Sequence, residues 1–225
     1  MKRAVSFLFL MGLLAWTGPG LVRGAGDSSS PRQGKDRASV PQAAAPIPLA
    51  GQGDEVSEKI HLEGGLSTWT VTHDGRHNLQ VELLNSEGQS VAMPVNEIGA
   101  FRGTLVVRVG KAGDYRVNVR ADGRWTVTIQ QPRPETGEAK PVAKEGQGAD
   151  LACFVELPHG LTVFRVTHTG EGIFRVKVYD REGRLVQEPF AQLGAYKGSK
   201  PVSLDQAGTY AVAVSAHGAW TLKIE

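Results

Sequence analysis

Two histidines in similar surroundings are the first candidates for chemistry. His73 follows Val71-Thr72, and His168 follows Val166-Thr167. An imidazole can serve as a general base or a metal ligand near neutral pH. One histidine is a poor metal centre, because zinc takes three or four protein ligands. The alternative, which we favour, is that each ring sits at a strand end on the core side and hydrogen-bonds the loop that follows.

Two short loops, each beginning and ending with glycine, place an aromatic residue beside a cation. The first loop holds Phe101 and Arg102, and the second holds Tyr196 and Lys197. These four residues are the predicted ligand-binding residues, since a ring can stack on a sugar or peptide and binding residues concentrate on loops. Alternatively, each ring plugs one end of a sandwich and the glycines supply positive φ angles. Aromatic side chains more often join the core, which favours the plug.

Three arginines and the single cysteine also stand out. Arg116, Arg120 and Arg124 are predicted to form a stripe on one solvated face, where charge discourages edge pairing. Cys153 could bridge to another chain, although a lone cysteine is more often buried. The sequence has no G-x-S-x-G, no H-E-x-x-H and no phosphate-binding loop. We therefore expect no enzyme, no catalytic residue, no metal and no cofactor.

The elements that must position these residues occur twice in the chain. At an offset of 95 residues, 51–130 and 146–225 align without a gap and share 29 of 80 positions. The aligned pairs include both histidines and both glycine-bounded loops. Such self-similarity indicates duplication of one structural unit.

Both copies show the period-two alternation of β-strands. Tyr115, Val117 and Val119 alternate with polar residues, and Asp122-Gly123 separates this run from the next, which is a hairpin signal. Glu87-Gly88 is a similar turn signal. We expect about seven strands per unit, and hence an all-β chain of two tandem antiparallel β-sandwich modules, jelly-roll or immunoglobulin-like. The predicted core aromatics are Trp69, Tyr115, Trp125, Phe164, Tyr210 and Trp220.

Composition shifts divide the rest of the chain. Lys2 and Arg3 precede an apolar run over 4–16, and small residues follow, so 1–24 is predicted to be a bacterial-type signal peptide and the protein secreted or periplasmic. The run is shorter than the roughly 20 residues of a membrane span, so we expect no integral membrane segment once the signal is removed. Polar, proline-containing stretches predict a disordered tether over 25–50 and a linker over 132–145. The repeats then occupy 51–131 and 146–225.

The charge balance excludes two classes of partner. The formal charge of the chain is +2, but Lys2, Arg3 and Arg23 belong to the predicted signal, so the remainder carries −1. A nucleic-acid-binding surface needs clustered cations in excess, and polybasic attraction to anionic lipid needs the same. We therefore expect neither nucleic acid nor a charged lipid surface as partner.

Strand-like segments of both units carry a family resemblance. Leu79–Leu83 ends near Glu87-Gly88, and Ala207–Val214 precedes a closing Trp220–Ile224. In these features the units resemble pre-peptidase C-terminal modules, small and often tandem β-sandwiches of secreted bacterial and archaeal proteins. The resemblance covers about 160 of 225 residues. It implies an association with secreted hydrolases and, in collagen-binding relatives, calcium held by clustered acids; here the acids near the module starts are limited to Asp54-Glu55.

These observations predict a binding protein. We expect an exported, non-catalytic tandem β-sandwich protein that binds carbohydrate or protein of the cell envelope, with avidity from two linked modules. One alternative is a secreted hydrolase, or a hydrolase accessory, whose site is built from scattered residues including His73 and His168. The other is a purely structural spacer.

Overall fold

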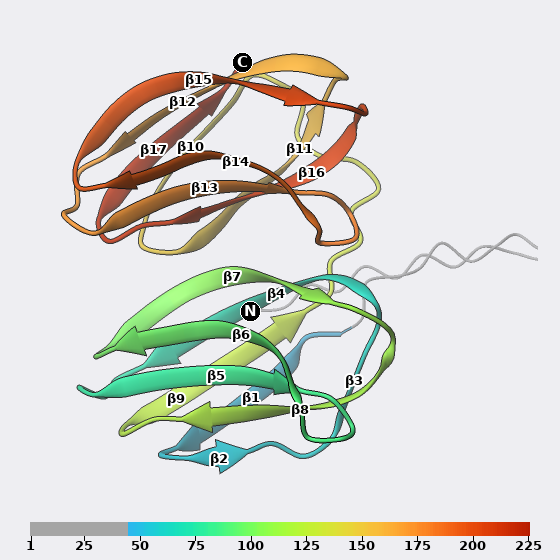
Figure 1. Ribbon diagram of the computed structural model, residues 1–225, viewed down its shortest axis with the longest axis vertical. Helices are drawn as coiled ribbons and strands as arrows, with labels where there is room; N and C mark the ends of the chain where they lie inside the picture. The colour runs from blue at the N-terminus through green and yellow to red at the C-terminus, as the bar shows by residue number, and fades with distance from the viewer. Residues whose placement is uncertain (1–44) are drawn as a thin grey trace, which may run out of the picture. The chain divides into compact units, whose positions relative to one another are not determined.

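The computed structural model describes residues 45–225, which consist of β-strands joined by turns and loops (Figure 1). All of these residues belong to one compact unit. Over this range the chain has no helix of the length and apolar character needed to cross a membrane. The predicted signal peptide, 1–24, and most of the predicted tether, 25–50, lie outside the described residues.

The first repeat folds into one β-sandwich, here called module 1. One sheet has the strand order β1-β9-β4-β7, and the other has the order β2-β8-β5-β6, with β3 also paired to β8. The strands are β1 (Ile47–Gln52), β2 (Glu55–Val56), β3 (Ile60–Leu62), β4 (Gly65–His73), β5 (Asn78–Leu84), β6 (Ser90–Ile98), β7 (Phe101–Val109), β8 (Gly113–Arg120) and β9 (Arg124–Gln130).

The second repeat folds into module 2 with the same pairing. Its sheets have the orders β10-β17-β12-β15 and β11-β16-β13-β14. The strands are β10 (Val142–Gln147), β11 (Asp150–Leu157), β12 (Gly160–His168), β13 (Ile173–Tyr179), β14 (Leu185–Leu193), β15 (Tyr196–Leu204), β16 (Gly208–Ser215) and β17 (Ala219–Ile224).

The strand order is that of a jelly roll. With β2 and β3 counted as one interrupted strand, each module has eight strands arranged as 1-8-3-6 in one sheet and 2-7-4-5 in the other. This order builds two Greek keys and differs from the immunoglobulin arrangement. The prediction of an all-β fold of antiparallel sandwiches is therefore confirmed, and of its two variants the jelly roll is the one formed.

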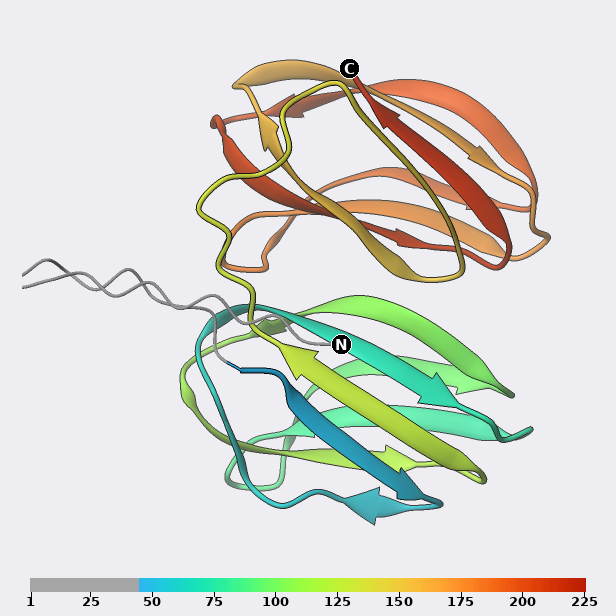
Figure 2. The same ribbon diagram turned by 180° about the vertical axis from the view of Figure 1, so that it is seen from behind.

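Two predicted boundaries and the strand count are wrong. β1 begins at Ile47, inside the predicted tether, and β10 begins at Val142, inside the predicted linker. Both are edge strands that pair with one neighbour, β9 and β17 respectively (Figure 2). An edge strand tolerates proline such as Pro48, because one side of its backbone needs no partner. These first strands raise each module from about seven strands to eight.

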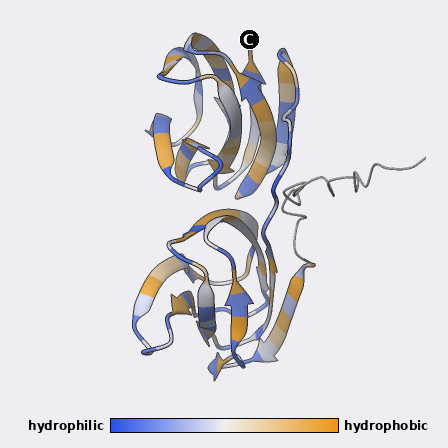
Figure 3. Cartoon of the chain, turned by 90° about the vertical axis from the view of Figure 1, so that its right-hand side faces the viewer, coloured by the Kyte–Doolittle hydropathy of each residue, from blue (hydrophilic) through white to orange (hydrophobic). Residues whose placement is uncertain are grey.

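The core of each module lies between its two sheets. Alternating hydrophobic and hydrophilic residues along the strands are visible in Figure 3. The two tryptophans nearest the sandwich ends keep their indole N–H groups bonded: Trp125 Nε1 donates to Gly53 O and Trp220 Nε1 to Gly148 O, each at 3.0 Å. The six predicted core aromatics are all buried: Trp69, Tyr115, Trp125, Phe164, Tyr210 and Trp220.

One turn prediction is confirmed and one is wrong. Glu87-Gly88 connects β5 and β6, which pair with each other as a hairpin. Asp122-Gly123 connects β8 to β9, and these strands belong to different sheets. The turn therefore carries the chain across the sandwich, an outcome that the local residues alone do not distinguish from a hairpin.

Candidate functional site

Each candidate histidine is the last residue of a strand that has a neighbour on both sides in its sheet. His73, the last residue of β4, lies opposite Phe101 of β7 and Trp125 of β9. Its buried Nδ1 is 2.9 Å from Gly99 O, and His168 Nδ1 is 2.9 Å from Gly194 O. A carbonyl only accepts, so Nδ1 carries the proton and donates in both modules. Each histidine therefore anchors a loop by a hydrogen bond, as predicted. The anchored loop is the glycine-bounded loop that begins at Gly99 or Gly194, not the loop that directly follows the histidine.

The second nitrogen of each ring is buried and lacks a hydrogen-bond partner among the described residues. His73 Nε2 lies 3.3 Å from Asp122 Oδ1 without forming a hydrogen bond to it. The ring of His168 instead stacks on Phe174, with centroids 4.9 Å apart. Nε2 of each ring is thus buried away from solvent.

The predicted ligand-binding pairs divide between core and solvent. Phe101 and Tyr196 are half-buried and pack against the cores of their modules. A Cβ added to Gly103 would lie 3.0 Å from Phe101 Cζ, so the ring crosses the strand over a residue that must lack a side chain. The aromatic rings thus close the sandwich ends as plugs, while the side chains of Arg102 and Lys197 are exposed.

Around Arg102, module 1 has a shallow depression of about 430 Å3. Its rim holds an ion pair, Arg124 Nε to Asp74 Oδ2 at 3.0 Å, reinforced by the Arg124 backbone N–H donating to Asp74 Oδ1 at 2.7 Å. The hydrogen bond from the Arg124 side chain has the largest effect in lowering the pKa of Asp74. The lining residues are Thr72, His73, Asp74, Ala100, Phe101, Arg102, Arg124, Trp125 and Thr126.

The depression brings two threonine hydroxyls close to the exposed side chain of Arg102. The hydroxyls of Thr72 and Thr126 are 2.6 Å apart on the exposed side of the sheet. Module 2 repeats this hydroxyl pair, Thr167 and Thr221, also at 2.6 Å. The ion pair is absent there, because Thr169 and Ala219 occupy the places of Asp74 and Arg124. The charged depression is therefore a property of module 1. Of its lining residues, the sequence predicted only Phe101 and Arg102 as ligand-binding residues.

Asp122 organises the neighbouring turn. Its carboxylate accepts the Arg76 N–H at 3.0 Å and is 2.8 Å from His77 Nδ1. These hydrogen bonds hold the pKa of Asp122 well below its usual range, and the bond from the Arg76 N–H has the largest effect. Within residues 45–225 no group of three or more His, Cys, Asp or Glu side chains is placed to hold a metal ion.

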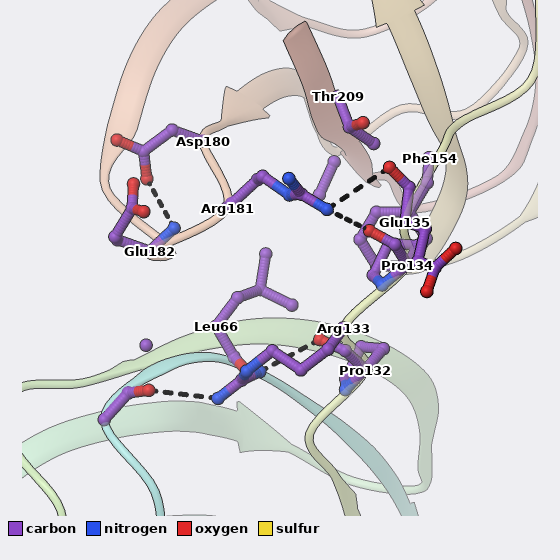
Figure 4. Close-up of a pocket in the computed structure, with 13 residues that line it drawn as sticks. Leu66, Pro132, Arg133, Pro134, Glu135, Phe154, Asp180, Arg181, Glu182 and Thr209 are labelled. Carbon is purple, nitrogen blue, oxygen red and sulfur yellow. Dashed lines mark hydrogen bonds between the residues drawn. The ribbon is translucent and has the colours of Figure 1, made fainter. Parts of the chain in front are cut away.

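A second cavity, of about 420 Å3, lies beside the segment Pro132–Glu135 (Figure 4). Its two arginines are bonded to backbone oxygens: Arg133 Nη1 donates to Leu66 O at 2.7 Å, and Arg181 donates to the carbonyls of Pro134 and Glu135. Through these bonds the two guanidinium groups brace this segment of the chain. The sequence signal was only an arginine within a proline-rich stretch.

The arginine stripe and the cysteine have plain structural explanations. Arg116 and Arg120 belong to β8, whereas Arg124 begins β9 in the other sheet, so the predicted single stripe is wrong. Arg116 Nη1 donates to Ser57 O at 2.8 Å. Cys153 is buried, and that burial raises the pKa of its thiol to about 12. It is therefore unsuited to an intermolecular bridge.

The fold and this site define a tandem jelly-roll protein whose end loops are anchored by buried histidines. No protein-family model matches the chain, and no curated protein matches it. Among solved structures it is similar to the PBSX exported protein XepA, at 12% identity and a TM-score of 0.26, over 82% of this chain and 87% of that one. It is also similar to a conserved protein of unknown function, PA5104 of Pseudomonas aeruginosa PAO1, at 14% identity and a TM-score of 0.25, over 74% and 76%. At these scores neither similarity supports an inference about this chain, and the pre-peptidase C-terminal relationship stays a prediction.

Proposed function

We propose that the protein is an exported, non-catalytic carbohydrate-binding protein whose ligand contacts the depression around Arg102 in module 1. The observation that carries the proposal is the combination of an exposed cation, an ion pair and two hydroxyls around one depression. Export rests on the signal-like sequence of residues 1–24.

Sugar chemistry suits these groups. Carbohydrate hydroxyls both donate and accept, so they match a carboxylate acceptor such as Asp74 and guanidinium donors such as Arg102. The ion pair holds Asp74 and Arg124 in place before a ligand arrives, which lowers the ordering cost of binding. The shallow shape suits a chain lying across the surface better than a small molecule that needs enclosure.

The test is retention of the purified chain on polysaccharides from the producing organism's envelope. Arg102→Ala should weaken binding by roughly tenfold or more, the effect of losing a charge-assisted hydrogen bond. Lys197→Ala is the matched control in module 2 and should change binding by less than about twofold. Phe101→Ala is a poorer probe, because its ring packs on the core and truncation would destabilise the module.

Three outcomes would count against the proposal. Retention that Arg102→Ala leaves intact would remove the depression as the site. Retention only on exported proteins would replace carbohydrate with protein as the ligand class. Shortening of the bound polysaccharide would contradict the non-catalytic assignment and favour the hydrolase alternative.

A further inference from the structure

Equivalent leucines of the two modules differ sharply in exposure. Leu66 of β4 and Leu161 of β12 occupy the same place in the repeat. Each faces outward, since their cross-strand partners are Arg108 and Ser203, which are exposed. Leu66 is 1% exposed, whereas Leu161 is 70% exposed. One outer face is therefore covered within the chain, and the equivalent face of module 2 is bare.

The turn between β13 and β14 contributes to covering Leu66. A Cβ added to Gly183 would lie 3.0 Å from Leu66 Cα and 3.4 Å from Arg108 Cα. The contact continues along the edge of β7, where the Thr104 N–H donates to Ala149 O at 2.9 Å. Module 1 thus supplies a leucine face and a strand edge, and module 2 supplies a glycine turn and a backbone carbonyl.

Module 1 has its own copy of that glycine turn. Asn85 Oδ1 accepts the N–H groups of Glu87 and Gln89 at 3.0 and 2.9 Å. Asp180 Oδ1 accepts the equivalent pair in module 2 at 3.1 and 2.8 Å. Gly88 and Gly183 have almost the same φ, 78° and 75°. A Cβ on Gly88 would meet no atom of residues 45–225 within 4 Å, so none of these residues covers this turn.

The chain therefore carries two unused halves of one contact. The face around Leu161 lacks a turn, and the turn around Gly88 lacks a face. We infer that the protein associates head to tail with a second copy of itself, the Gly88 turn of one copy packing on the Leu161 face of the next. Such a contact is heterologous, so repeated association generates a ring or an open filament.

Charge differences between the repeats fit this second contact. Where the internal contact has Ala149, module 1 has Asp54; where module 1 has Leu105 on β7, module 2 has Lys200 on β15. Copying the internal geometry would place Asp54 of one chain at the β15 edge of the next, which carries Lys200. Leu105 itself packs against the core of module 1, and the Lys200 ammonium lies 5.3 Å from the centroid of the Phe190 ring. Arg116 replaces Ala211 on the turn-bearing sheet, which makes the contact more polar than the internal one and its affinity lower.

The test is sedimentation velocity of the purified chain from dilute to millimolar concentration, without carbohydrate. We expect the sedimentation coefficient to rise with concentration. Leu161→Glu should abolish the rise by placing charge on the face. Gly88→Asn should abolish it as well, since asparagine tolerates positive φ but adds a side chain at the point of closest approach. Ile98→Glu is the control, because Ile98 is 83% exposed and lies outside the proposed contact.

A mixture of the two variants makes the test specific. Leu161→Glu keeps an intact Gly88 turn and Gly88→Asn keeps an intact Leu161 face, so together they should form one-to-one pairs and nothing larger. A wild-type chain that stays monomeric would overturn the inference. Loss of association with Leu161→Glu but not with Gly88→Asn would also overturn it, because that result indicates a dimer in which two Leu161 faces meet. An equal loss of association with Ile98→Glu would overturn it as well. Circular dichroism of each variant shows that the modules remain folded. None of these results depends on the carbohydrate proposal.

Discussion

The buried histidines contribute to the architecture of the loops through one ring nitrogen. Their position on the core side of a strand end followed from alternation with Trp69 and Val71, and the sequence supported that much. The partner, a glycine carbonyl 26 residues further along the chain, depends on β6 and β7 meeting the end of β4. A contact of that range has no local sequence signature.

Replacing His168 with phenylalanine should measure this anchor. The substitution retains an aromatic ring to stack on Phe174 but removes the donor to Gly194 O. We expect a loss of about 1 kcal/mol in the free energy of unfolding, the net value of such a hydrogen bond. Urea denaturation measures it. His217→Phe, on an exposed histidine of module 2, should change stability by less than about 0.5 kcal/mol, and an equal loss there would refute the anchor.

Asp122 should make module 1 sensitive to acid. Its pKa is lowered in the folded state by the hydrogen bonds from Arg76 and His77, relative to about 3.9 in an unfolded chain. A lowered carboxyl pKa contributes stability that is fully present above the unfolded pKa and is lost as the pH falls through the folded pKa. The stability gap between wild type and Asp122→Asn should thus shrink as the pH falls below about 4. A gap that stayed the same down to pH 2.5 in urea titrations would contradict this.

At the scale of elements, alternation was a sufficient guide to the strands and an insufficient guide to their partners. The runs around Tyr115 and Trp125 are strands as predicted, yet they belong to opposite sheets. β1 and β10 escaped notice because edge strands carry proline and polar residues that also mark linkers. Which strands share a sheet is decided by packing of the whole sandwich.

A glycine on each of these edge strands should be indispensable. A Cβ added to Gly146 of β10 would lie 2.5 Å from Trp220 Cζ2, inside the contact distance of any real pair. Gly146→Ala should therefore cost on the order of 1–3 kcal/mol, as overpacking does. Gly208→Ala is the control, since a Cβ there meets nothing within 4 Å. Thermal unfolding compares the two variants. Equal midpoints would contradict the prediction, because they would mean that the Trp220 side chain moves aside with no loss of stability.

At the scale of the whole molecule, the two copies share a framework and differ in their surfaces. Both keep the histidine anchor and the threonine pair. Only module 1 has the Asp74–Arg124 ion pair beside its exposed cation, and only module 2 leaves its outward leucine bare. After duplication, one sandwich thus has a polar site and the other an open face. Alignment of the two repeats shows these differences as substitutions, but their meaning depends on which side chains are exposed in the structure.

The most direct test of the central claim, that the depression around Arg102 binds carbohydrate, is amide chemical-shift mapping. The isotope-labelled chain would be titrated with a soluble fragment of the polysaccharide that retains it. We expect the largest shifts at Thr72, Arg102 and Thr126, with the equivalent amides of module 2, at Thr167, Lys197 and Thr221, nearly unmoved. Shifts confined to module 2, or spread over the Leu161 face, would contradict the assignment of the site.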